Sequence, residues 1–93
     1  MSLTWVDGVA ADTVPADDRG LNYADGAFET LSCHEGRIQH EDLHRSRLTR
    51  ALAALGMASA AEQSERLFEE AGRCLETTGH TGVARLTVTR GSG

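Results

Sequence analysis

The chain has 93 residues and fits one domain, because domains span roughly 50–250 residues. Its 40% hydrophobic and 25% charged residues are typical of a folded protein, and no apolar run approaches the roughly 18–20 residues of a membrane span. The net charge of −5 disfavours nucleic acid as a partner, because phosphate binding needs a basic surface. The start of the chain has no signal-peptide pattern, so we expect a cytoplasmic protein.

All nine basic residues are arginine, and the chain contains no lysine. Every mechanism in which a lysine amine bonds covalently to a carbonyl is therefore closed to this chain acting alone. Cys33 and Cys74 form no CxxC pair, and we expect both to be ordinary buried thiols in a reducing compartment.

The first part of the chain predicts a hairpin followed by a loop. Residues 3–6 are apolar and β-prone, Asp7-Gly8 is a hairpin-turn signal, and residues 9–10 resume the strand. Residues 11–18 contain the single proline and three aspartates, and we expect a loop there.

Residues 27–34 predict a strand with two different faces. One face is apolar except for one carboxylate, and we expect it to meet the core: Ala27, Glu29, Leu31 and Cys33. The other face carries one aromatic ring among polar groups, as expected of a pocket wall: Phe28, Thr30, Ser32 and His34. Glu35-Gly36 then predicts a turn into a short partner strand, residues 37–39.

Two consecutive helices are expected next. The first begins near Glu41 and ends before Gly56, with a stripe of leucines at Leu48, Leu52 and Leu55. Ser59 and Glu62 form a capping box that predicts the start of the second helix, whose apolar face comprises Leu67, Ala71, Cys74 and Leu75 with Phe68 alongside. Gly79 is expected to end it.

The last element is a half-buried strand at residues 83–89. Ala84, Leu86 and Val88 alternate with the polar side chains of this strand. Strands followed by grouped helices indicate an α+β fold, here a small antiparallel sheet with two consecutive helices.

One short motif matches a zinc-hydrolase pattern. His40, Glu41 and His44 fit H-E-x-x-H, in which two histidines bind zinc and the glutamate acts as a general base. A third ligand is needed, and only Glu65 or Glu69 offers one. Because Arg45 follows the motif directly and would repel a metal ion, we expect two ordinary histidines at a helix start and no metal site.

A series of short segments, in register along the whole chain, resembles the N-terminal domain of the fold-type IV pyridoxal-phosphate enzymes. These segments are Asp18-Arg19-Gly20-Leu21, Tyr23 to Thr30, Gly36-Arg37-Ile38, His44 to Leu48, and Thr87 to Gly93. The family includes branched-chain aminotransferases, D-amino-acid aminotransferases and 4-amino-4-deoxychorismate lyase. It implies pyridoxal 5′-phosphate as cofactor, a small-molecule substrate and a homodimer.

Among these members the chain is most similar to the lyase branch. Thr30 stands two residues after the family's aromatic, where lyases tend to carry threonine, and the ending Thr89 to Gly93 is also similar. The resemblance implies conversion of 4-amino-4-deoxychorismate to 4-aminobenzoate and pyruvate, a step toward folate. A branched-chain or D-amino-acid aminotransferase is the alternative within the family. Outside it stand the zinc hydrolase and a non-catalytic interaction module.

The resemblance also implies roles for individual residues. Arg47 matches the arginine that binds the cofactor phosphate, although the residues alone favour a solvated helix arginine, and His44 is expected to pack or orient. Phe28, Thr30 and Tyr23 match pocket positions, and Thr30 is the candidate catalytic residue, positioning or protonating the departing enolpyruvyl group. We claim no chemistry for Asp25-Gly26, which predicts a turn.

The family's cofactor-bearing lysine lies in a later, larger domain. The resemblance therefore implies that residues 1–93 are one truncated N-terminal domain, inactive alone because the lysine-bearing domain is absent.

Overall fold

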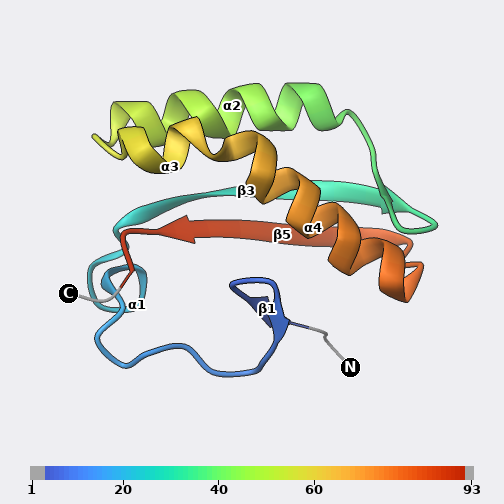
Figure 1. Cartoon of the computed structure of the whole chain (residues 1–93), viewed down its shortest axis with the longest axis horizontal. Coiled ribbons are helices and arrows are strands. Elements are labelled where there is room, and N and C mark those ends of the chain that lie inside the picture. Colours follow the sequence, from blue (N-terminus) through green and yellow to red (C-terminus); the bar gives the residue numbers. More distant parts are fainter. Residues whose placement is uncertain (1–3, 92–93) are drawn as a thin grey trace.

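The computed structural model describes residues 4–91, and its elements are shown in Figure 1. In chain order they are β1 (Trp5–Val6), β2 (Val9–Ala10), α1 (Arg19–Tyr23), β3 (Gly26–His34), β4 (Arg37–Ile38), α2 (Glu41–Ala54), α3 (Ala58–Glu62), α4 (Ser64–Thr78) and β5 (Gly82–Thr89). Leu3 and the Ser92-Gly93 end of the last segment lie outside the described residues. In the described part, no helix combines the length and apolar character needed to cross a membrane.

The central sheet is antiparallel, with the strand order β4-β3-β5. β3 pairs with β5 along nearly its whole length, from Gly26 opposite Thr89 to Cys33 opposite Gly82. β4 pairs only with the end of β3, at Cys33 and His34, so no described strand lies along the same edge of β3 at residues 26–31. The predicted α+β fold with a small antiparallel sheet is confirmed.

Two predicted hairpin turns are present. Asp7-Gly8 joins β1 to β2, and Glu35-Gly36 joins β3 to β4, with positive φ at all four residues. Positive φ at both central residues is the requirement of a type I′ turn, whose twist matches that of the flanking strands. Gly36 is also tightly placed, because an added Cβ would lie 2.9 Å from the Cα of Glu76.

The core lies between one face of the sheet and the helices α2, α3 and α4, which all cover that face (Figure 1). Its buried apolar members are Leu31, Cys33, Leu48, Leu52, Met57, Phe68 and Leu75. Alternation along β3 and the leucine stripe of α2 predict this correctly, except that Leu55 is exposed. On α4, Phe68 and Leu75 are the buried apolar side chains, whereas Leu67 and Cys74 are half-buried.

The capping box predicted at Ser59 and Glu62 is wrong. Both residues lie inside the short helix α3, whose preceding residue Met57 makes no side-chain cap. The helical conformation is interrupted at Gln63 instead, between α3 and α4. There the hydroxyl of Ser64 donates to the carbonyl of Ala61 over 2.7 Å. Met57 is buried in the core, so tertiary packing sets the entry into α3 in place of the local cap.

Helix α1 was not expected, although the loop before it was. The carboxylate of Asp18 caps α1, accepting from the backbone N–H of Gly20 and Leu21. Ala24 ends the helix in the left-handed conformation, with φ of 53°. A helix of 5 residues is too short to show a hydrophobic period, and this explains the omission.

The core of α2 provides a test of the packing. Leu52 is 0% exposed, so Leu52→Ala is expected to lower the free energy of unfolding by about 3 kcal/mol through lost burial and a cavity. Leu43→Ala is the matched control on the same helix, because Leu43 is 70% exposed and its loss should change stability by less than about 0.5 kcal/mol. Equilibrium urea unfolding measures both; equal losses would contradict the described packing.

Candidate functional site

A bidentate ion pair joins helix α2 to the sheet. Arg47 Nε lies 3.1 Å from both Oε1 and Oε2 of Glu29, and Nη2 lies 2.8 Å from Oε1. Glu29 is only 6% exposed because the alternation of β3 turns it toward the helices, as the sequence predicts. The arginine side chain, in contrast, is 62% exposed. The pair therefore combines a buried anion with a cation that reaches solvent.

His44 is a second donor to the same carboxylate. Its Nδ1 lies 2.7 Å from Oε1 of Glu29, and the side chain is largely buried. An ionised carboxylate only accepts hydrogen bonds, so we assign the proton to Nδ1. The 3.4 Å approach of Arg47 Nη2 to Nδ1 then brings two donors together around one acceptor group. His44 thus orients the cluster formed by Glu29, His44 and Arg47, as expected.

The charges of this cluster shift one another's titration. The hydrogen bonds from Arg47, opposed by burial and helped by His44, lower the pKa of Glu29 below its usual value. The Glu29 carboxylate in turn raises the pKa of Arg47. Glu29 and Arg47 therefore remain an ion pair at neutral pH.

The zinc alternative finds no support in this geometry. His44 is committed to Glu29 through Nδ1, and His40 lies before the first turn of α2 with φ of 54°, outside the helical face that the motif requires. Among residues 4–91 no cluster of three or more histidine, cysteine or carboxylate side chains could hold a metal ion. Arg45 pairs with Asp42 at 2.8 Å and with Glu41 at 3.7 Å, the second contact being an i,i+4 pair along α2.

Phe28 and Thr30 lie on the other face of the sheet, which α2, α3 and α4 do not cover. Phe28 is 53% exposed, and the guanidinium of Arg85 stacks over its ring at 4.0 Å from the centroid. The register places Arg85 opposite Thr30 and Thr87 opposite Phe28. The placement of Phe28 and Thr30 away from the core is as predicted. Two hollows of the described surface lie elsewhere, beside α2 and beside β4. Phe28 and Thr30 are both exposed, and we call their side of the sheet the open face.

Tyr23 belongs to α1, at the end of the sheet where β3 begins. The guanidinium of Arg19 stacks on its ring, 4.8 Å from the centroid, and Tyr23 is exposed. No described contact joins Tyr23 or Arg47 to Phe28 or Thr30. The roles assigned to these residues therefore remain predictions.

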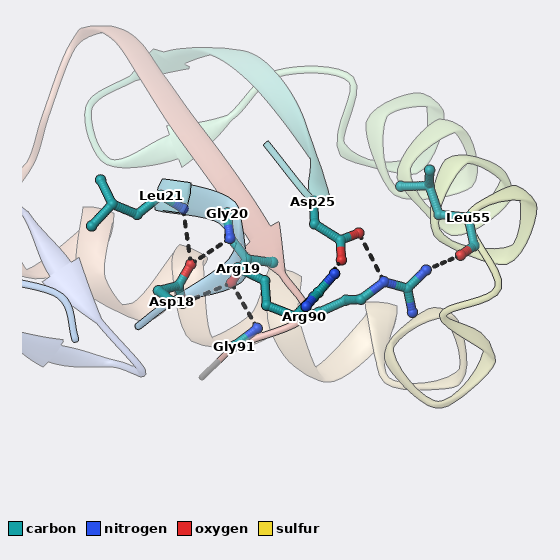
Figure 2. Close-up of polar contacts among 9 residues, drawn as sticks. Asp18, Arg19, Gly20, Leu21, Asp25, Leu55, Arg90 and Gly91 are labelled. Atoms are coloured by element: carbon teal, nitrogen blue, oxygen red, sulfur yellow. Dashed lines mark hydrogen bonds and ion pairs between the residues drawn. The ribbon is translucent and has the colours of Figure 1, made fainter. Parts of the chain in front are cut away.

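Asp25 holds a network that the sequence did not indicate (Figure 2). Its Oδ2 accepts from Arg19 Nε and its Oδ1 from Arg90 Nε, each over 2.8 Å. Arg90 also donates to the carbonyl of Leu55, which links the end of β5 to the end of α2. The two arginines lower the pKa of Asp25. Asp25 is thus a structural anchor as well as the residue before a strand.

The segment that leaves β5 has further ties to α1. The backbone N–H of Arg19 donates to the carbonyl of Gly91 over 2.7 Å, and the hydroxyl of Thr89 donates to Asp18 over 3.0 Å. Figure 2 shows Asp18, Arg19 and Gly91 together at one end of the sheet. The chain is therefore tightly held as it leaves β5.

Sequence reasoning missed Arg85 and the partners of Glu29 and Asp25. Arg85 had a signal, because the clean alternation of its strand already placed it on the polar face. The partners of the two carboxylates had none, since Arg47 is 18 residues from Glu29 and Arg90 is 65 residues from Asp25.

Comparison with known proteins places this fold. A 4-amino-4-deoxychorismate lyase from Pseudomonas aeruginosa matches with a TM-score of 0.85 and 37% identity, over 96% of this chain and 32% of that one. Nearly the whole of this chain thus shares the fold of about one third of that lyase. A fold IV transaminase from Curtobacterium pusillum matches with a TM-score of 0.65 and 32% identity, over 90% of this chain and 32% of that one.

Further matches support the fold-type IV family. An aminodeoxychorismate lyase of Vibrio harveyi is 35% identical over 53 residues, which are 57% of this chain and 20% of that protein. A hypothetical aminotransferase from Mycobacterium tuberculosis, solved with pyridoxal phosphate bound, matches with a TM-score of 0.68 and 28% identity, over 89% of this chain and 30% of that one. No protein-family model matches. The chain spans a third or less of the length of these relatives.

The two anchoring carboxylates predict a loss of stability in acid. Their lowered pKa values mean that the ion pairs stabilise the fold above the ordinary carboxyl pKa of about 4 and lose this effect as the pH falls through the lowered values. We expect the melting temperature to fall steeply below about pH 4.

Glu29→Gln should remove part of this acid dependence, because an amide does not titrate. Thermal unfolding followed by circular dichroism across the acid range measures the effect. Glu62→Gln is the control, because Glu62 makes no ion pair among the described residues and its loss should leave the profile unchanged. Parallel profiles for the wild type and Glu29→Gln would contradict the role of Glu29.

Proposed function

We propose that this chain is the small domain of a pyridoxal-phosphate-dependent lyase that converts 4-amino-4-deoxychorismate to 4-aminobenzoate and pyruvate, in folate biosynthesis. The observation that carries the proposal is the match to the Pseudomonas aeruginosa lyase over 96% of this chain. The Vibrio harveyi lyase supports the same assignment from sequence. In this proposal the protein is a cytoplasmic homodimer, acting on a small molecule.

The donor chemistry of Arg47 fits the cofactor phosphate. Its Nε and one Nη2 hydrogen face Glu29, whereas Nη1 makes no hydrogen bond to a described residue. A guanidinium with one edge free and exposed to solvent matches the geometry of phosphate oxygens. Pyridoxal phosphate, when bound, supplies an electron sink for the substrate carbon. Arg47 would hold its phosphate.

The lysine that this chemistry needs is not in the chain. The chain has no lysine and covers 32% of the Pseudomonas aeruginosa lyase. We propose that the lysine belongs to a larger domain outside residues 1–93, and we expect residues 1–93 alone to bind the cofactor weakly and to catalyse nothing.

The open face of the sheet suits the substrate. Arg85 lies opposite Thr30 there, and the single acidic residue of β3 and β5, Glu29, points to the core instead. A cation without a competing carboxylate favours an anionic ligand, and both chorismate derivatives and pyruvate carry carboxylates. Phe28 and Tyr23 supply aromatic surface. In this proposal the Thr30 hydroxyl positions the departing enolpyruvyl group or donates a proton to it.

An aminotransferase is the second candidate, because the Curtobacterium pusillum and Mycobacterium tuberculosis matches carry that description. The two functions differ in their products, and one experiment separates them.

The assay uses the protein at its natural length, loaded with pyridoxal phosphate. We expect it to release 4-aminobenzoate and pyruvate from 4-amino-4-deoxychorismate, measured by fluorescence and by a coupled reduction of pyruvate. Rapid consumption of D-alanine and 2-oxoglutarate without release of 4-aminobenzoate would replace the lyase by the aminotransferase. Zinc bound stoichiometrically after purification would instead support the zinc-hydrolase alternative.

Thr30 provides a sharper test of the lyase chemistry. Thr30→Val keeps the shape of the side chain and removes the hydroxyl, so we expect kcat for 4-aminobenzoate release to fall about 100-fold. Thr30→Ser is the matched control, because it keeps the hydroxyl and should retain most of the activity. Equal activity in the valine and serine variants would remove Thr30 from the mechanism.

A further inference from the structure

The contact between Glu29 and Arg47 divides the guanidinium into two edges. One edge, formed by Nε and one hydrogen of Nη2, is engaged by the carboxylate over 2.8–3.1 Å. The other edge, formed by Nη1 and the remaining Nη2 hydrogen, donates to no acceptor in the described residues. A planar guanidinium held along one edge presents the other edge in a fixed direction.

The difference in burial shows that Glu29 is the fixed partner and that Arg47 is the mobile side chain it restrains. Glu29 lies in a central strand and is 6% exposed, whereas the side chain of Arg47 is 62% exposed. An exposed arginine has many rotamers and loses that freedom when it binds a ligand. The buried carboxylate removes much of this freedom beforehand, which is the condition for preorganised binding.

His44 fixes the carboxylate in turn. Its Nδ1 contacts the same Oε1 that Arg47 Nη2 contacts, at 2.7 Å, and both donors lie on α2 one turn apart. Oε1 of Glu29 therefore accepts from two neighbouring donors of α2, and a rotation of the carboxylate would break at least one of these contacts. Strand β3 thus supplies the anchor, and α2 supplies both donors.

We propose that Glu29, held by His44, is a positioning residue that aims the free edge of Arg47 at the phosphate of pyridoxal phosphate. This inference rests on the proposed function, in which Arg47 binds that phosphate. The negative charge of Glu29 opposes the phosphate electrostatically, but the phosphate approaches the opposite edge of the guanidinium from solvent, where screening is strong. Orientation therefore outweighs repulsion.

The test compares two ligands that differ only in the phosphate group. Binding of pyridoxal phosphate and of pyridoxal is measured by absorbance titration, with the apo-protein at its natural length. Glu29→Gln removes the charge, whereas Glu29→Asp keeps the charge but draws the carboxylate back by one methylene. We expect both variants to bind pyridoxal phosphate about tenfold more weakly and pyridoxal as tightly as the wild type.

The two substitutions separate geometry from charge. Unchanged affinity for pyridoxal phosphate in Glu29→Asp, or tighter binding in Glu29→Gln, would show that Glu29 acts only through its charge and would overturn the proposal. Equal weakening for both ligands would show a merely structural role and would also overturn it. Should Glu29→Gln fail to fold in a thermal melt, the milder Glu29→Asp still decides the question.

Two further variants complete the design. Asp25→Asn breaks a comparable carboxylate–arginine contact outside the cluster formed by Glu29, His44 and Arg47, and should leave the ratio of the two affinities unchanged. Arg47→Gln should lower that ratio at least as much as the Glu29 variants do. If Arg47→Gln leaves the ratio unchanged, the cofactor contact of the proposed function fails; if only the Glu29 variants leave it unchanged, the positioning role alone fails.

Discussion

The carboxylate of Glu29 is a buried charge, and the position of helix α2 on the sheet depends on how that charge is satisfied. Removing a carboxylate from water is costly unless donors surround it. Arg47 and His44 provide those donors from one face of α2. The leucines of the same helix, Leu48 and Leu52, fill the core beside them. Apolar packing holds α2 against the sheet, and the ion pair selects its register.

Asp25 forms a second cluster of carboxylate–arginine ion pairs at one end of the sheet. Because it accepts from Arg19 and Arg90, it joins α1 to the segment after β5, and Arg90 extends the link to Leu55. These residues are far apart in the sequence and lie in or next to different helices and strands. The ion-pair clusters of Glu29 and Asp25 thus add contacts between elements to a core whose buried apolar side chains are few.

Periodicity was sufficient for the sheet and for α2. The alternation of β3 correctly turns Glu29 inward and Phe28 outward, because a strand leaves no third choice of face. It failed at α1 and at the break before α4, where a single cap or the burial of Met57 decides the outcome. Local patterns contain no information about tertiary packing of that kind.

In the candidate site, too, some features were predictable from the sequence and others were not. The inward turn of Glu29 was predictable from its strand, but its partners were not, because an ion pair between distant residues leaves no periodic trace. The role of Arg47 came from resemblance to a family and not from periodicity. Arg85 was within reach of the strand pattern, but its stacking on Phe28 depends on the register of β3 with β5.

Because the cations of these ion pairs are arginines and not lysines, the pairs are lost in acid but persist in alkali. A guanidinium keeps its proton far above neutral pH, whereas an ordinary lysine has lost half of its charge at about pH 10.4. The contacts of Glu29 and Asp25 therefore persist in alkaline solution. Burial also raises the pKa of the Cys33 thiol, so this core thiol keeps its proton to a higher pH than an exposed thiol does. The ionic contacts of this fold are built to withstand alkali.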